Sequence, residues 1–137
     1  MDCLGCRIAN HMEPDIQVVY ENEHITCVLD IKPFNEGHLL ILPKKHFHEL
    51  EEIDEVTLMG IMTTSVKISE MIKDIFTPDG ITICQNGDIF NDLHHYHMHL
   101  IPRYINDGFS WSDPIIEHKA ETRLKETKNK FKRSLHY

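Results

Sequence analysis

The sequence predicts an α+β domain, with an antiparallel sheet of about five strands covered by helices. Short stretches with the period of a strand lie on both sides of one long stretch with the period of a helix, in the order strands, helix, strands, helix. The chain has 137 residues, 41% of them hydrophobic, which is enough for one core and leaves no room for a second. We therefore expect a single domain over residues 1–137.

The first strands and the long helix have clear boundary signals. Residues 16–31 predict two short strands around the polar turn 21–23, the second ending at Asp30. The apolar run HLLILP is too short for a helix and predicts a buried strand that ends at Pro43. From Asp54, a favourable N-cap residue, apolar side chains recur at helical spacing up to the Thr-Pro-Asp-Gly turn. One long amphipathic helix is therefore expected, followed by the strand ITIC.

Histidines alternate with apolar residues in the stretch HHYHMHLIPRY (94–104). This period predicts a strand with His95, His97 and His99 on one face. Alternate strand residues lie about 6.6 Å apart, so neighbouring imidazoles can bind one metal ion or line one anionic group. The metal interpretation gives a site with an open coordination position. In the other interpretation a neutral imidazole attacks phosphorus as a nucleophile.

The charge of the chain is unevenly distributed. Residues 119–137 contain seven basic and two acidic residues, a net charge of +5, and the whole chain carries −8, so the remainder carries −13. A body with this charge repels a polyanion, which argues against extended nucleic-acid binding, and a small anionic ligand needs local donors. The basic segment has a thin apolar stripe at helical spacing, and we expect a solvated C-terminal helix or tail.

The N-terminal residues predict a cytoplasmic protein without a membrane partner. Residues 1–15 contain acidic groups and no apolar signal segment, and no later stretch approaches the roughly 18 apolar residues of a membrane span. Structural disulfides are not expected in a reducing compartment. The Cys3-Leu-Gly-Cys6 pair is therefore a candidate for metal binding or redox chemistry.

Several motifs resemble those of the histidine-triad (HIT) family. The stretch HYHMHLI (95–101) matches its signature, in which three histidines alternate with apolar residues. The cysteine-bearing start CLGCRIANHMEP, the stretches VYENEH and VLDI, the block GHLLILPKKH and the IPRY after the triad follow in family order over residues 1–112, as in bacterial, zinc-bearing members. The resemblance implies a HIT-like fold whose sheet continues across a homodimer. It also implies a nucleotidyl hydrolase or transferase acting on nucleoside-monophosphate-linked substrates, either phosphoramidates or dinucleoside polyphosphates.

The resemblance assigns roles to single residues. It implies that His97 attacks the α-phosphorus and forms a nucleotidyl-histidine, and that His99 contacts the phosphate. It places Asp30 at the ribose hydroxyls, since a carboxylate accepts two hydrogen bonds from a diol, and Ile31 against the base. Magnesium is not strictly required, because histidines and backbone donors can stabilise the charge. The catalytic group that it implies is His38, His95, His97 and His99.

The stretch before the triad departs from the family pattern. Relatives usually carry small residues and a hydroxyl there, whereas this chain reads NGDIFNDLH, with Phe90 near the glycine and Asp92 at the hydroxyl. Asn86 and Asn91 still match substrate-binding positions. An aspartate beside a phosphate is repulsive unless it is protonated or turned away. The departure motivates an alternative function, a nucleotide-binding regulatory module with weak turnover.

The metal site is a separate expectation. Cys3, Cys6 and His46 offer three ligands of a closed tetrahedral zinc site, and by resemblance to zinc-bearing relatives His95 is the fourth. His48 is a competing ligand. The expected zinc is structural and fixes the N-terminus to the histidine strand. A metal-dependent hydrolase that uses the histidine triad as ligands is the remaining alternative.

Overall fold

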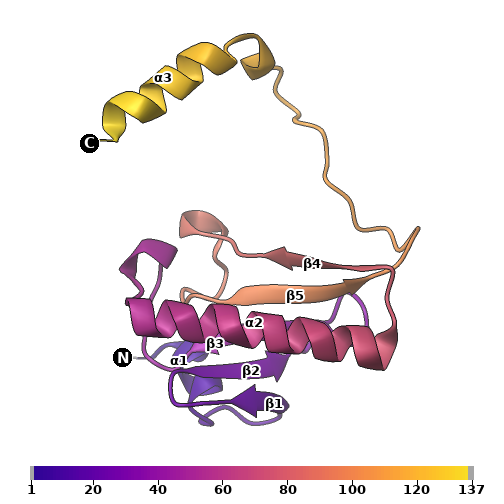
Figure 1. Cartoon of the computed structure of the whole chain (residues 1–137). Helices are drawn as coiled ribbons and strands as arrows, with labels where there is room; N and C mark the ends of the chain where they lie inside the picture. The colour runs from indigo at the N-terminus through magenta and orange to yellow at the C-terminus, as the bar shows by residue number, and fades with distance from the viewer. Residues whose placement is uncertain (1, 136–137) are drawn as a thin grey trace. The chain divides into compact units, whose positions relative to one another are not determined.

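The structure, a computed structural model, describes residues 2–135 and has the predicted α+β architecture (Figure 1). Its strands are β1 (Val18–Glu21), β2 (Ile25–Leu29), β3 (Leu39–Pro43), β4 (Gly80–Cys84) and β5 (Met98–Arg103). Its α-helices are α1 (Leu4–Ala9), α2 (Glu55–Phe76) and α3 (Leu124–Ser134). The short 3-10 helices are η1 (Leu50–Glu52), η2 (Asp88–Phe90) and η3 (Ala120–Thr122).

The strands form one antiparallel sheet in the order β1-β2-β3-β5-β4. Strand β5 lies between β3 and β4, with His99 opposite Leu40 on one side and Cys84 on the other. The histidine segment therefore enters the centre of the sheet, next to the strand that follows His38. Strands β1 and β4 are the edges.

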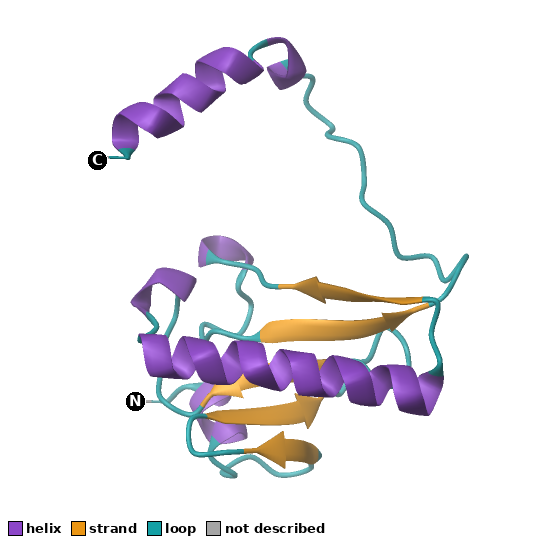
Figure 2. Ribbon diagram, viewed as in Figure 1, coloured by secondary structure: helices purple, strands orange, loops and turns teal. Residues whose placement is uncertain are grey.

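The two faces of the sheet carry different layers (Figure 2). Helix α2 covers one face, where Tyr96, Met98 and Leu100 pack in a core with residues of α2 such as Ile68. On the other face α1 packs through Ile8 in a smaller core. The predicted alternation is thus correct, because the apolar residues between the histidines point to α2 and the imidazoles point to the face of α1.

Helix α2 has the predicted boundaries. The Asp54 side chain caps its N-terminus by accepting a hydrogen bond from the Thr57 backbone N–H. Thr77 ends the helix in a left-handed conformation, with φ at 42°. The side chains that face the sheet keep helical spacing over the full 22 residues. The helix therefore packs along one face of the central strands.

Strand β5 starts later than predicted. Its ladder begins at Met98, so His95 and His97 precede the strand. On the β4 side the ladder ends where Cys84 lies opposite His99, and on the β3 side it ends at the pair of Ile41 and Met98. Residues 95–97 instead use other bonds: the backbone N–H of Tyr96 donates to the Phe47 carbonyl at 2.7 Å.

The chain divides into two compact units, Met1–Asp107 and Gly108–Tyr137. The first holds the sheet, α1 and α2. The second holds η3 and α3, where the sequence predicts a basic helix or tail over 119–137, of which residues 136–137 lie outside the described part. Among the described helices, none is long and apolar enough to cross a membrane.

Candidate active site and metal centre

A pocket of about 290 Å³ opens on the face of the sheet that carries α1. Its polar lining comes from Asp30 after β2, Asp92 in the loop before the triad, and two of the triad residues, His97 and His99. Apolar side chains of α1, β2 and β3 form the rest of the wall, together with Ile31. The pocket thus combines two imidazoles and two carboxylates with an apolar surface.

A backbone carbonyl two residues earlier in the chain determines which ring nitrogen of His97 carries the hydrogen. Its Nδ1 lies 2.9 Å from the His95 carbonyl oxygen, which can only accept, so Nδ1 carries the hydrogen and donates. In the neutral imidazole Nε2 then holds a free lone pair. The side chain is only 4% exposed, and a carboxylate oxygen of Asp92 lies 3.7 Å from Nε2. Nε2 is therefore the ring nitrogen of His97 whose lone pair is available to act as a nucleophile.

A chain of hydrogen bonds sets the protonation of His99. The Phe34 backbone N–H donates to Nδ1 of His38 at 3.0 Å, so the hydrogen of neutral His38 is on Nε2. That Nε2 lies 2.9 Å from Nδ1 of His99 and 3.5 Å from a carboxylate oxygen of Asp30. Donation from His38 to His99 leaves the hydrogen of His99 on its own Nε2. His99 is therefore poised as a hydrogen-bond donor.

Both supporting imidazoles are neutral near pH 7. Burial lowers the pKa of His38 from its ordinary value of 6.5, opposed by the nearby Asp30 carboxylate. Burial, together with His97 and His38, lowers the pKa of His99 to about 4. Neutral His38 and His99 keep the donor direction described above, because protonation of His99 would remove the acceptor that His38 uses.

Asp30 and Ile31 form the rim of the pocket. One carboxylate oxygen of Asp30 accepts from the Lys32 backbone N–H at 2.8 Å, which fixes the side chain in the turn after β2. The other oxygen is on the His38 side. The Ile31 side chain is 75% exposed, so it offers an apolar surface that a flat ring can cover.

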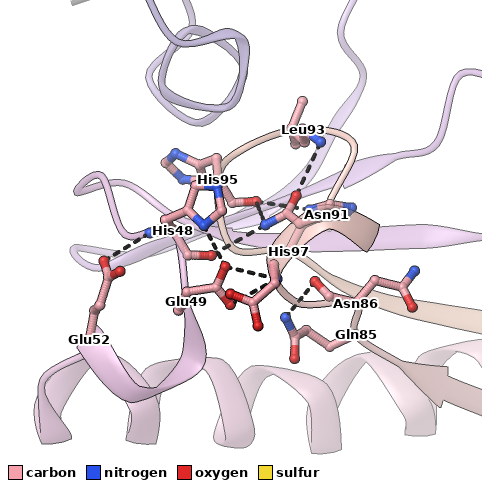
Figure 3. A network of polar contacts seen from close by, with 10 residues as sticks. His48, Glu49, Glu52, Gln85, Asn86, Asn91, Leu93, His95 and His97 are labelled. Atoms are coloured by element: carbon pink, nitrogen blue, oxygen red, sulfur yellow. Dashed lines mark hydrogen bonds and ion pairs between the residues drawn. The ribbon is translucent and has the colours of Figure 1, made fainter.

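The loop before the triad is held by a buried asparagine (Figure 3). Asn91 is fully buried; its Nδ2 donates to the carbonyls of His48 and His95, at 3.2 and 3.3 Å, and its Oδ1 accepts from the Leu93 N–H. The Asn91 amide is therefore used by backbone groups around it, and its expected part in substrate binding stays a prediction. Asn86 is exposed and lies outside the pocket lining.

The first triad histidine faces a different cluster. Nε2 of His95 donates to the Pro43 carbonyl at 2.8 Å, so its Nδ1 is a free acceptor. This Nδ1 lies 3.6 Å from Sγ of both Cys3 and Cys6, and Nδ1 of His46 lies 3.4 Å from Sγ of Cys6. The ligand atoms of all four residues lie within 4.8 Å of one another.

These separations fit zinc. A tetrahedral zinc with bonds of about 2.0–2.3 Å keeps its donor atoms about 3.3–3.8 Å apart. Burial and the neighbouring Cys3 raise the pKa of the Cys6 thiol to about 11, which is the expected effect of two sulfurs placed together without a cation. The competing ligand, His48, instead pairs with Glu49 at 2.5 Å. The four residues therefore have the chemistry and the spacing of a closed zinc site.

The helix that carries the cysteines lies against this histidine. Gly5 of α1 is so close to His95 that a Cβ at position 5 would lie 2.3 Å from Cβ of His95. Only a glycine permits this approach. The sequence alone gives no sign of this contact, because the C-L-G-C spacing allows any small residue between the cysteines.

The sequence profile of the HIT domain matches residues 11–106. The chain belongs to the HIT family. Protein hit of Bacillus subtilis is 35% identical over 125 residues, 88% of this chain and 86% of that protein. The adenylylsulfatase HINT3 of Arabidopsis thaliana is 29% identical over 122 residues, 88% of this chain and 61% of that protein.

Solved structures of HIT proteins share the fold over nearly the whole chain. A HIT family protein of Bacillus anthracis has a TM-score of 0.81 at 29% identity, covering 98% of this chain and 97% of that one. A histidine triad nucleotide-binding protein of Candida albicans has a TM-score of 0.80 at 28% identity, with 98% and 97% covered. A zinc-bound histidine triad protein of Mycobacterium smegmatis has a TM-score of 0.73 at 26% identity, with 98% of both chains covered.

In this HIT protein the three triad imidazoles do not converge on one point. In the described chain, His95 groups with Cys3 and Cys6, whereas His99 groups with Asp30 and His38. The ring centroids of His97 and His99 are 5.0 Å apart. The triad therefore divides between a cysteine-rich cluster and the pocket, which gives no support to a metal held by all three histidines.

Proposed function

We propose that this HIT protein is a nucleotidyl hydrolase or transferase that forms a covalent nucleotidyl-histidine at His97. The observation that carries the proposal is the bond from Nδ1 of His97 to the His95 carbonyl, which leaves the Nε2 lone pair in the pocket. The likeness to a protein named adenylylsulfatase supports a substrate with a nucleoside monophosphate on a leaving group. Which leaving group it takes is a separate question.

The reaction proceeds in two displacements at the α-phosphorus. In the first, the Nε2 lone pair of His97 forms a bond to phosphorus, the bond from phosphorus to the leaving group breaks, and its electron pair departs with that group, which takes a proton from solvent. In the second, water attacks phosphorus, the N–P bond breaks, and the electron pair returns to Nε2. The proton of the water passes to solvent, and nucleoside monophosphate is released.

The other pocket residues bind and orient the substrate. Asp30 accepts hydrogen bonds from the ribose hydroxyls, and the exposed Ile31 packs on the base. His99 donates from Nε2 to a phosphate oxygen, in the direction that His38 imposes on it. Because these donors and acceptors are fixed before the substrate arrives, they stabilise the transition state without reorganising.

Replacing the nucleophile tests this function. His97→Asn should abolish turnover of an adenosine phosphoramidate and of a diadenosine polyphosphate, while adenosine monophosphate still binds, because binding is distributed over Asp30, Ile31 and His99. Steady-state rates and calorimetric binding give the two readouts, and rates with and without a chelator complete them. An active His97→Asn variant would exclude covalent catalysis at this residue.

A second candidate function is a nucleotide-binding module with weak turnover. It is favoured by Asp92, whose Oδ1 lies 3.7 Å from Nε2 of His97, where a phosphate must approach. In that case wild-type protein binds adenosine monophosphate and releases product from either substrate class only slowly.

We also propose a structural zinc ion held by Cys3, Cys6, His46 and His95. A bound zinc would join Cys3 and Cys6, at the start of α1, to His46 after β3 and His95 before β5. The His95 ring is already oriented for it by the bond to the Pro43 carbonyl. The zinc has no part in the displacement steps.

We further propose that the protein is a homodimer whose sheet continues across β4, with a nucleotide as its other partner. An exposed apolar stripe on α2 and the free edge of β4 support this assembly. The cytoplasmic location stays a prediction from the sequence.

A further inference from the structure

Asp92 lines two neighbouring pockets at the candidate active site. Its carboxylate is the charged group next to Nε2 of His97, at 3.7 Å, and its side chain is 94% exposed. Asp92 also lines a neighbouring pocket of about 520 Å³, whose wall includes Arg7, His48 and His94. The side chain therefore stands between the pocket of the nucleophile and a second space, into which a leaving group can extend.

Hydrogen bonds hold the loop that carries Asp92 in place (Figure 3). Before it, the Asp88 N–H donates to both carboxylate oxygens of Glu49, at 2.9 and 3.1 Å. The adjacent residue, Asn91, is buried and bonded to the His48 and His95 carbonyls. With its neighbours held in this way, Asp92 projects from an ordered turn. The carboxylate is thus presented to the nucleophile by the fold of the loop.

The charges around this carboxylate are mostly negative. The pocket of His97 is lined by two carboxylates, Asp30 and Asp92, and no lysine or arginine is among the described residues of its wall. In the neighbouring pocket the Arg7 guanidinium is already paired with Asp2 and, at 3.0 Å, with Glu13. Extra negative charge on a substrate therefore meets repulsion from Asp30 and Asp92, and the arginine that lines the second pocket among the described residues is already paired.

We propose that Asp92 selects the leaving group by charge, favouring groups that depart from a protonated nitrogen or carry a positive charge and opposing those that depart as anions. The proposal rests on the proposed function. When a P–N bond breaks, the nitrogen first takes a proton from solvent, so it carries positive charge in the transition state and becomes a neutral amine once it has taken the electron pair of the bond. When a P–O bond breaks, the oxygen takes the electron pair and becomes negative. A nearby carboxylate stabilises the first transition state and destabilises the second.

The distance between the Asp92 carboxylate and a charge on the leaving group sets the size of the rate effect. One unit charge about 7 Å from the carboxylate, at an effective dielectric constant of about 20 to 80, changes the rate by about threefold to fiftyfold. The preference should shrink as salt screens the interaction, because the Asp92 side chain is exposed.

Three adenosine 5′-phosphoramidates test the proposal. Their amines have the same length and end in a quaternary ammonium, a hydroxyl or a carboxylate. We expect wild-type kcat/KM to favour the ammonium over the carboxylate compound by about tenfold, and Asp92→Asn to bring the ratio close to one. Asp88→Asn is the matched control, since it removes the same charge from the same loop outside both pockets, and it should keep the wild-type ratio.

Binding of the same compounds to the His97→Asn variant separates the two proposals. A charge preference that is equal in wild type and Asp92→Asn overturns the role of Asp92. If wild type turns over none of the compounds, the proposed function fails. The charge selection by Asp92 then stands if the His97→Asn variant binds the ammonium compound more tightly and loses this preference on Asp92→Asn, and it fails if all three compounds bind equally.

Discussion

At the scale of single residues, each imidazole of the triad has one nitrogen committed to a hydrogen bond that sets the use of the other. His95 donates to Pro43 and presents Nδ1 to the cysteines, whereas His97 donates to His95 and presents Nε2 to the pocket. The same residue type thus faces a cysteine cluster at one position and the pocket two residues later. The difference comes from which carbonyl each ring meets.

Two glycines should respond in opposite ways to the same substitution. Gly5→Ala places a Cβ 2.3 Å from His95 and should destabilise the fold by about 1–3 kcal/mol through overpacking. Gly60 lies within α2, and Gly60→Ala adds a Cβ 3.7 Å from His24 and Ile25, which is an ordinary contact. This variant should stabilise the fold by about 0.5–1 kcal/mol. Chemical denaturation of both variants gives the free energies. A Gly5→Ala variant as stable as wild type would mean that α1 does not pack on His95 in solution.

The candidate site could be predicted where residue type carries the signal. The alternating histidines, the paired cysteines and Asp30 identify themselves by spacing and by resemblance to the HIT family. The burial of Asn91 could not be predicted, because it depends partly on a bond to the carbonyl of His48, which is distant in sequence. The Phe34 backbone N–H could not be predicted at all, since a backbone donor is present at every position and only the fold aims it.

At the scale of secondary structure, α2 and the first three strands follow the pattern of apolar residues closely. These elements have enough apolar residues at regular spacing to distinguish helix from strand. Asp54 and Thr77, which cap α2, also mark where that helix begins and ends. Helix α1 was missed because six residues are too few for a periodic signal. The alternation predicts a strand from His95, whereas β5 begins at Met98, three residues later. Alternation indicates on which side the side chains lie and not whether a partner strand is present.

The metal should hold α1 to the histidine segment. We expect one zinc per chain in wild type and none in the Cys3→Ser/Cys6→Ser variant, by elemental analysis. The variant should also melt at a lower temperature, because binding of a structural metal adds to the free energy of unfolding. Cys84→Ser is the control, since this thiol lies outside the cluster, and it should keep its zinc. Equal zinc in all three proteins, or none in wild type, would remove the site.

At the scale of the whole molecule, helix α2 carries apolar side chains that its own sheet does not cover. Met71 and Ile75 lie on the flank of α2 toward β1, where they line a cavity of about 240 Å³ with Val19. Met62 and Val66 are also exposed and lie one helical turn apart on α2, and β4 is an edge strand of the sheet. An apolar flank beside an open strand edge is the kind of surface that a second copy covers.

The oligomeric state tests this surface. Wild type should have the mass of a dimer by light scattering, and Val66→Glu should shift the mass toward the monomer, because it places a charge in the apolar contact. Met12→Glu is the control: Met12 is also an exposed apolar residue but lies outside α2 and β4, so this variant should stay dimeric. A wild-type monomer at all concentrations would exclude the proposed homodimer.

The bond between Nδ1 of His97 and the His95 carbonyl also restricts what any reactive compound can do in this pocket. A free histidine gives two regioisomers with an electrophile, because either ring nitrogen can react. Here one nitrogen is masked by the chain itself, so an adduct forms as a single regioisomer, substituted at Nε2. Covalent probes for this pocket therefore need to match one trajectory, along the axis on which Nε2 faces Asp92.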